Sequence, residues 1–152
     1  MTTAINANAS WRDHLIDTSD GIRRVIEKTR RIAVLGIKQE FDRPAFYVPE
    51  YAQQAGYLIV PVPVFYPEAT EILGEKIYRS IAAIPGDVDM VNVFRRPGDI
   101  PPHVDDIIVK KPKSVWFQQG IRNDAAAERL AKAGIDVVQD RCLLVELQRL
   151  GK

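Results

Sequence analysis

The stretch "IAVLGIKQEFDRPAF", residues Ile32–Phe46, decides the fold. A continuous apolar run ends at Gly36, a short segment of mixed charge follows, and the chain then reaches Pro44, a residue favoured in the first turn of a helix. A strand, a glycine turn and a helix N-terminus in this order are typical of nucleotide-binding α/β proteins, although two of the three glycines usual in such turns are missing. The stretch therefore predicts a parallel sheet with a ligand site at the turn.

Length and composition indicate one ordinary globular domain. The 152 residues, 46% of them hydrophobic and 27% charged, suffice to bury a full core. A net charge of +1 predicts neither nucleic acid nor an anionic membrane as a partner, so any anion site must be local. The single cysteine, Cys142, excludes an internal disulfide and fits a reducing compartment. Because no apolar run reaches about 18 residues and no secretory signal is visible, we expect a cytoplasmic protein.

Five short β-branched runs alternate with segments of helical spacing. The runs are continuous rather than alternating, which favours strands covered on both faces, as in a parallel sheet. We predict strands at residues 31–36, 57–62, 88–94, 113–118 and 135–140. Helical spacing predicts helices at 44–56, 75–86, 101–111 and 124–134, three of which end in Gly56, Gly86 or Gly134. Pro101 and Pro102 fit a first helical turn, and Asn123–Asp124 fits an N-cap.

Two further helices are expected near the ends of the chain. One covers about residues 20–29 with Asp20 as its cap, and the other covers about 141–149. The repeated alternation favours an α/β fold of one domain: a Rossmann-like, doubly wound, five-stranded parallel sheet with an extra N-terminal helix. We divide the chain into an N-terminal extension with a helix, residues 1–24, and the sheet domain, residues 25–150.

The loop after the first strand, Gly36–Arg43, is the first candidate site. Ligands of open parallel sheets bind at the carboxyl ends of the strands, where this loop and a helix N-terminus present unpaired N–H groups. Gly36 has no Cβ to block close approach, and Lys38 and Arg43 add positive charge. These features favour phosphate. The alternative interpretation is a plain turn glycine with two solvated cations.

The end of the second strand disfavours NAD. Sheets that bind NAD usually place an acid there to hold the ribose. This strand instead ends in Val60–Pro63, and the first acid that follows it is Glu68. The aromatic residues Phe65 and Tyr66 follow. They are interpreted either as packing on a base or an apolar tail of a ligand, or as a cover for the edge of the sheet.

Two arginines follow the third strand in the segment Phe94–Arg96. Guanidinium groups grip phosphate through paired hydrogen bonds, so this segment favours a ligand with several phosphates. The alternative is that one arginine pairs with Asp99 or Asp105 at the surface. After the fourth strand, Gln118 is a candidate partner for an amide of the ligand, and Gly120 permits backbone approach.

Five segments together resemble the CoA-binding domain family: "VLGIKQEFDRPAF", "LIVPVPV", "EILGEKIYRSIAAIP", "VDMVNVFRRP" and "VWFQQGIRNDAAAERLAKAGIDVVQDRC". These are small Rossmann-like proteins similar to the N-terminal CoA-binding domain of the succinyl-CoA synthetase α subunit, and the resemblance covers roughly residues 25–150. Its most specific pieces are "EILGEK", "VFRR" and "DRC". It implies a five-stranded parallel sheet that holds coenzyme A across its carboxyl edge.

The resemblance also implies which residues meet the ligand. Phosphates would lie at residues 36–38 and Arg43, the segments 61–64 and 94–96 would line the adenosine and pantetheine, and Gln118 with Gly120 would close the far side. The implied set is Gly36, Ile37, Lys38, Arg43, Pro44, Pro61, Val62, Pro63, Phe94, Arg95, Arg96, Gln118 and Gly120.

Two positions depart from the usual pattern of the family. Many relatives have a small hydroxyl residue where Lys38 stands, and an asparagine before proline where this chain has Pro63–Val64. Lys38 could reach a phosphate or fill the space of the ligand, and Pro63 removes a side-chain hydrogen bond. Both changes bear on affinity rather than on the fold.

The sequence shows neither a catalytic grouping nor a metal-ligand pattern, so we predict a protein that is not an enzyme. Succinyl-CoA synthetase carries its phosphorylated histidine on a further domain. The histidines here are His14, in the N-terminal segment, and His103, interpreted as a solvated residue at a helix start. Cys142, next to Arg141, is either a thiolate that forms a mixed disulfide with CoA or a small packing residue.

We therefore expect a stand-alone protein that binds CoA or acyl-CoA at the carboxyl edge of the sheet, without catalysis and with an unidentified protein partner left open. One alternative is a non-catalytic interaction subunit that has lost the ligand. The other is an enzyme that uses a nicotinamide or acyl-CoA substrate.

Overall fold

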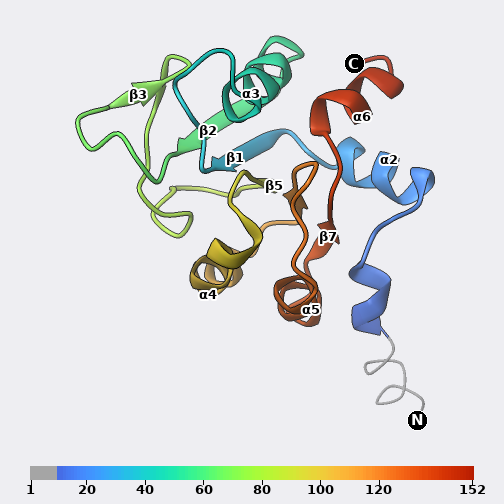
Figure 1. Ribbon diagram of the computed structural model, residues 1–152. Coiled ribbons are helices and arrows are strands. Elements are labelled where there is room, and N and C mark those ends of the chain that lie inside the picture. Colours follow the sequence, from blue (N-terminus) through green and yellow to red (C-terminus); the bar gives the residue numbers. More distant parts are fainter. Residues whose placement is uncertain (1–9) are drawn as a thin grey trace.

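The computed structural model describes residues 10–152 and shows three layers, with helices on both faces of one parallel sheet (Figure 1). The five strands follow the order β2-β1-β5-β6-β7, and every neighbouring pair is parallel. They are β1 (Arg31–Leu35), β2 (Leu58–Val62), β5 (Met90–Val93), β6 (Ser114–Phe117) and β7 (Asp136–Val138). All five predicted strands and the doubly wound α/β fold are confirmed.

The helices divide between the two faces of the sheet (Figure 1). The helices α4 (Pro101–Lys110) and α5 (Asp124–Lys132) cover one face. The other face is covered by α2 (Ser19–Glu27), α3 (Pro44–Gln54) and α6 (Leu143–Arg149). Short 3₁₀ turns, η1 (Trp11–His14) and η2 (Pro97–Asp99), and a small antiparallel hairpin, β3 (Glu71–Ile72) with β4 (Glu75–Lys76), complete the described elements.

Alternate residues of each strand enter different cores. In β1, Ala33 and Leu35 pack in the core under α4 and α5, whereas Ile32 and Val34 pack in the core under α2, α3 and α6. The same division separates Trp116 from Phe117, which are both fully buried in β6. Because both faces are covered, every position of a strand needs an apolar side chain, which explains the continuous runs in the sequence.

Proline and asparagine start the helices as predicted. Pro44 opens α3, and Pro101 and Pro102 open α4. Asn123 is the N-cap of α5: its Oδ1 accepts the N–H of Ala126 at 3.0 Å. Its Nδ2 also donates to the carbonyl of Pro97 at 2.9 Å, which ties α5 to η2.

Replacing Asn123 with alanine should lower the free energy of unfolding by about 1–2 kcal/mol, because the first turn of α5 loses its capping acceptor. Chemical denaturation measures the change. Asn123→Asp is the matched control, since it keeps the acceptor oxygen and loses only the bond to Pro97, and it should cost clearly less. Equal losses in the two variants would show that the bond to Pro97, and not the cap, stabilises this end.

The predicted helix at residues 75–86 is absent, and that prediction was wrong. Its first two residues, Glu75 and Lys76, form the strand β4 instead. The N–H of Tyr78 donates to the carbonyl of Pro61 at 3.0 Å, and the N–H of Ile81 donates to the carboxylate of Asp106 at 2.7 Å. The backbone donors that a helix would use are therefore bonded to other parts of the chain.

The apolar spacing that suggested this helix has another cause. Ile81 and Ile84 are buried in the core under α4 and α5, so the segment covers the sheet without forming a helix there. Gly86 consequently does not end a helix, although its φ of +78° does require a residue that tolerates the left-handed region.

The start of α2 also differs from the prediction. Thr18, and not Asp20, is the N-cap, and its hydroxyl accepts the N–H of Gly21 at 3.0 Å. Asp20 lies in the first turn, where its carboxylate pairs with Arg23 and Arg24. The predicted division of the chain at residues 24 and 25 falls within α2 and stays a prediction, and residues 1–9 of the predicted extension lie outside the described residues.

The two outer strands of the sheet are bonded along their outer sides. Next to β7, Leu15 forms a parallel bridge with Val137, and the N–H of Ile16 donates to the carbonyl of Val137 at 2.9 Å. Next to β2, the bond from Tyr78 occupies the carbonyl of Pro61, a residue that has no N–H of its own.

Candidate ligand site at the carboxyl edge of the sheet

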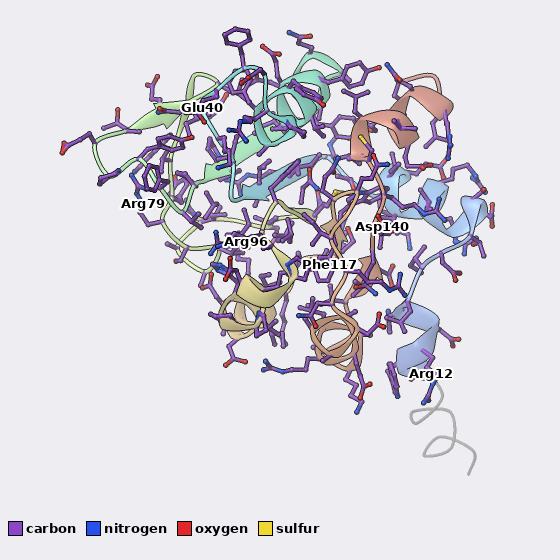
Figure 2. All side chains as sticks on the ribbon, viewed as in Figure 1. Arg12, Glu40, Arg79, Arg96, Phe117 and Asp140 are labelled. Carbon is purple, nitrogen blue, oxygen red and sulfur yellow. The ribbon has the colours of Figure 1, made fainter. Side chains whose placement is uncertain are left out.

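The carboxyl ends of the five strands meet along one edge, and most of the predicted site residues lie there. Gly36 follows β1, Pro63 follows β2, Phe94 follows β5 and Gln118 follows β6. Glu40 and Arg96, labelled in Figure 2, belong to the loops after β1 and β5, and Asp140 belongs to the turn after β7. Open parallel sheets bind ligands at this edge.

Gly36 is the point where two loops touch through their backbones. Its φ is +86°, and a Cβ at this position would lie 2.4 Å from the carbonyl oxygen of Phe94 and 3.2 Å from Cδ of Arg95. Its N–H donates to the carbonyl of Val62 at 2.8 Å. The sequence predicted that glycine permits the approach of a ligand; the structure shows that it also permits the approach of the loop after β5.

The loop after β1 carries two cations to the start of α3. Ile37 is buried, which leaves its backbone as the part that a ligand could reach, and Lys38 and Arg43 are exposed. Arg43 is the N-cap residue of α3, its side chain makes no capping bond, and the first turn of α3 contains no acid. Neither Lys38 nor Arg43 makes a side-chain hydrogen bond or ion pair with any part of the chain that the structure describes. The positive helix end and these cations favour an anion.

Arg95 adds a partly buried positive group beside Gly36. The Nε of Arg95 is buried and has no hydrogen-bond partner among residues 10–152. Its side chain is 27% exposed, and its guanidinium lies 3.9 Å from the nearer carboxylate oxygen of Asp99. A buried donor without a partner costs about 1–3 kcal/mol, and more when the group is charged. An oxygen of a ligand removes that cost once the Arg95 side chain turns so that Nε is accessible.

Arg96 lies in a different environment from its neighbour. Its side chain is 90% exposed, and its Nε is 3.1 Å from the same carboxylate oxygen of Asp99. This is the surface pairing that the sequence left open as an alternative. Asp105, the other candidate partner, pairs with Arg129 instead.

His103 is partly buried beside Arg95, so its interpretation as a solvated residue was wrong. Burial lowers the pKa of His103, and the positive charge of Arg95 lowers it further, whereas Asp106 and Asp99 act in the opposite direction. No local pattern indicates that these two side chains are close, because His103 and Arg95 belong to different elements, α4 and the loop after β5.

The low pKa of His103 predicts a pH dependence of stability. A pKa below the unfolded value of about 6.5 means that the unfolded chain binds the proton first as the pH falls. The contribution of His103 to the free energy of unfolding is therefore complete above about pH 6.5 and is lost as the pH falls below that value. Urea denaturation at about pH 7.5 and about pH 5.5 should show a loss of unfolding free energy in the original protein and a smaller loss in His103→Gln. The same loss in both would contradict the assignment.

The residues after β6 are bonded within the protein. Gln118 is buried, and its Oε1 accepts the N–H of Leu143 at 3.3 Å and the Nδ2 of Asn92 at 3.4 Å. The N–H of Gly120, which the sequence offered to a ligand, donates to the carboxylate of Asp140 at 2.6 Å. Gln118 therefore has only its Nε2 left for an amide-bearing ligand, since no described group accepts from it.

A contact between the first two loops was not predicted. The hydroxyl of Tyr66 donates to Oε1 of Glu40 at 2.6 Å and accepts the N–H of Gln39 at 3.2 Å. Arg79 donates to the carbonyls of Phe65 and Tyr66 at 2.8 and 2.7 Å. Tyr66 has a φ of +60°, a conformation that costs a non-glycine residue roughly 1–3 kcal/mol. Partners this far apart in the sequence leave no local signal.

The remaining predicted groups lie at the margin of the site. Cys142 is the N-cap residue of α6, is partly buried and packs against the core under α2, α3 and α6, so its mixed disulfide stays a prediction.

Across residues 10–152, no three His, Cys, Asp or Glu side chains are grouped so that they could hold a metal ion. No described helix combines the length and the apolarity that crossing a membrane requires.

A separate hollow lies between the N-terminal segment and α5. Its volume is about 380 Å³. It contains none of the predicted site residues; its lining residues are Trp11, Leu15, Ile16, Asp17, Arg122, Asp124, Ala127, Glu128, Val137 and Gln139.

The chain is similar to one protein family and to proteins of several organisms. The family model described as a CoA binding domain matches residues 30–148. The protein YneT of Bacillus subtilis (strain 168) is 36% identical over 124 residues, which cover 82% of this chain and 90% of YneT. The solved structure of cell-free ID.343 from Thermus thermophilus is 37% identical, with a TM-score of 0.81 over 88% of this chain and 99% of that one. A hypothetical protein from Pyrococcus horikoshii OT3 is 32% identical, with a TM-score of 0.82 over 90% of this chain and 94% of that one.

Proposed function

Because the chain belongs to the CoA binding domain family, we propose that it binds coenzyme A, free or acylated, at the carboxyl edge of its sheet and does not transform it. The phosphates lie along residues 36–43 and the first turn of α3. The long amide-bearing arm runs past the segment Phe94–Arg96 toward Gln118. Pro61, Val62 and Pro63, at the end of β2, line the neighbouring wall.

The observation that carries the proposal is the environment of the Arg95 side chain. Its buried Nε has no partner among residues 10–152, and its side chain lies against Gly36, next to the loop that carries Lys38 and Arg43. Arg95, whose ion pair with Asp99 is long at 3.9 Å, thus stands near two cations for which the described residues provide no partner. A pyrophosphate supplies the negative charge and the acceptor oxygens that this group of cations lacks.

The position of Lys38 supports an open site. Its departure from the family pattern raised the alternative that its side chain fills the ligand space. Lys38 is exposed, and its backbone N–H donates to the carbonyl of Ala45 at 3.1 Å, which fixes the backbone of the loop. Its side chain is not buried in the edge, which is the arrangement that ligand binding requires.

A holding role without turnover fits three of the carboxylates at the edge. Glu40 is bonded to Tyr66, Asp99 to Arg96, and Asp140 to the N–H of Gly120. A general base must be within reach of its substrate and free to accept a proton. Carboxylates engaged in this way position loops and neutralise cations.

Titration calorimetry with CoA, acetyl-CoA and NAD tests the proposal. We expect saturable heat with both CoA compounds and none with NAD, since the end of β2 has no acid to hold the ribose. Mass spectrometry of the ligand after incubation should recover CoA and acetyl-CoA unchanged. No heat and no thermal shift with CoA at millimolar concentration would overturn the proposal, and conversion of acetyl-CoA above background would favour an enzyme.

A further inference from the structure

Lys38 and Arg43 have no side-chain partner among residues 10–152, although acids stand beside them in the sequence. The loop "KQEFDR", residues 38–43, contains Lys38, Glu40, Asp42 and Arg43. A tight turn, in which the N–H of Arg43 donates to the carbonyl of Glu40 at 3.1 Å, brings the backbones of these two residues together. Yet no ion pair within this loop forms in the part of the chain that the structure describes. Some other group must engage the carboxylate of Glu40.

That group is the phenol of Tyr66, which belongs to the loop after β2. Its hydroxyl donates to Oε1 of Glu40 at 2.6 Å, a short, charge-assisted bond. The hydrogen bond from Tyr66 lowers the pKa of Glu40, and the charges of Lys38 and Arg43 act through space in the same direction. Glu40 is therefore ionised at neutral pH, and its carboxylate is hydrogen-bonded to Tyr66, whereas Lys38 and Arg43 act on it only through space.

The backbone around Tyr66 is built to keep the phenol in place. Figure 2 shows Glu40 and Arg79 on the same side of the molecule, and they belong to the loop after β1 and the segment after β4. Arg79 bonds the carbonyls of Phe65 and Tyr66, so the left-handed conformation of Tyr66 is fixed by a charged side chain. The N–H of Gln39 donates to the same hydroxyl at 3.2 Å, which also ties the loop of residues 38–43 to the phenol.

We propose that Tyr66 is a positioning residue that holds the carboxylate of Glu40 away from Lys38 and Arg43, so that these cations stay available to the phosphates of the ligand. Without the phenol, Glu40 turns to the nearest cation and competes with the ligand as an internal anion. The inference deepens the proposed function and rests on it for the identity of the ligand. It concerns affinity, and it assigns Tyr66 no contact with CoA.

The test uses the full chain, three single variants and two double variants. Tyr66→Phe removes the hydroxyl and keeps the ring, which packs edge-to-face on Phe65 with 5.3 Å between the ring centroids. Glu40→Gln removes the competing charge and keeps its shape. Asp42→Asn is the matched control, because it removes a charge from the same loop that Tyr66 does not hold. Titration calorimetry with CoA and, separately, with inorganic pyrophosphate gives the affinities, and thermal unfolding checks that each variant folds.

We expect Tyr66→Phe to weaken CoA binding by about fivefold at low salt, a change of the size that an exposed ion pair provides. The loss should shrink at about 0.5 M NaCl, since salt screens the competing pair. In the Glu40→Gln background the same substitution should change affinity by less than about twofold. In the Asp42→Asn background the fivefold loss should persist.

Three outcomes separate this inference from the proposed function. A loss on Tyr66→Phe that is equal with and without Glu40, or that salt does not change, would show that Tyr66 only shapes the loop and would overturn the inference. If the original protein binds pyrophosphate but not CoA and the Glu40 dependence holds, the inference stands and the proposed ligand is wrong. If it binds neither, both fail.

Discussion

Replacing Gly36 with alanine should lower the free energy of unfolding by about 3 kcal/mol or more, the largest loss that we expect from a single added methyl group. The new Cβ would lie 2.4 Å from the carbonyl oxygen of Phe94. That oxygen belongs to a backbone held by the bond from the N–H of Phe94 to the carbonyl of Leu35 at 2.8 Å, so it cannot move away alone. The φ of +86° adds a further cost for any residue with a side chain.

Gly134→Ala is the matched control for this variant. Gly134 has a φ of +85°, nearly that of Gly36, but an added Cβ there meets no atom within 4 Å. Gly134→Ala should lower the free energy of unfolding only by the cost of placing a side chain at a positive φ, about 1–2 kcal/mol. Urea denaturation compares the two. Gly36→Ala should also weaken CoA binding because the first loop and Arg95 shift together, whereas Gly134→Ala should leave affinity unchanged. Equal stability losses would show that the contact with Phe94 relaxes easily.

Replacing Arg95 with methionine should weaken CoA binding by about 30- to 100-fold, the loss of a charge-assisted hydrogen bond in a partly buried place. Methionine keeps the apolar stem that packs against Gly36 and removes the buried, unpaired Nε. The free energy of unfolding should therefore hold or rise. Arg96→Met is the control: its guanidinium is exposed and paired with Asp99, and its loss should change affinity by less than about threefold.

An independent readout accompanies the affinity measurement. Arg95 lowers the pKa of His103, so NMR titration of the imidazole should show a higher pKa in Arg95→Met than in the original protein. Equal affinity losses for Arg95→Met and Arg96→Met would mean that the two arginines act together as a diffuse positive surface. An unchanged affinity for Arg95→Met would contradict the site itself.

Much of the fold follows from local patterns. The five strands are readable because each is buried on both faces, and β1 needs apolar residues at Ile32, Ala33, Val34 and Leu35 alike. Pro44 and Asn123 mark helix starts through their own backbone chemistry. In these elements the sequence and the tertiary contacts favour the same structure.

The errors arise where side chains outside the apolar pattern compete for the backbone. Asp106, on α4, binds the N–H groups of Ile81 and Ala82 and so takes the donors of a segment with helical spacing. Thr18 displaces Asp20 as the cap of α2 because Asp20 is engaged by the arginines of its own helix. Neither outcome can be read from periodicity, since each depends on a partner that the pattern does not include.

The candidate site could also be predicted only in part. The strand ends and the glycine turn could be placed from the sequence, since every parallel strand ends at the same edge. The difference between Arg95 and Arg96 could not, because two adjacent arginines look alike until one is buried. The bond between Tyr66 and Glu40 also joins loops whose distance is set only by the order of β1 and β2 in the sheet.

The hydrogen bonds along the outer sides of β2 and β7 bear on how copies of this protein can meet. An open strand can serve as a template on which a second chain adds its own strand, a route to fibres and domain-exchanged aggregates. The bridge from Leu15 to Val137 occupies part of that template beside β7, and the bond from Tyr78 to Pro61 occupies part of it beside β2. A second chain that adds a strand at either edge must first break these bonds, which disfavours this route relative to contacts through helices and loops.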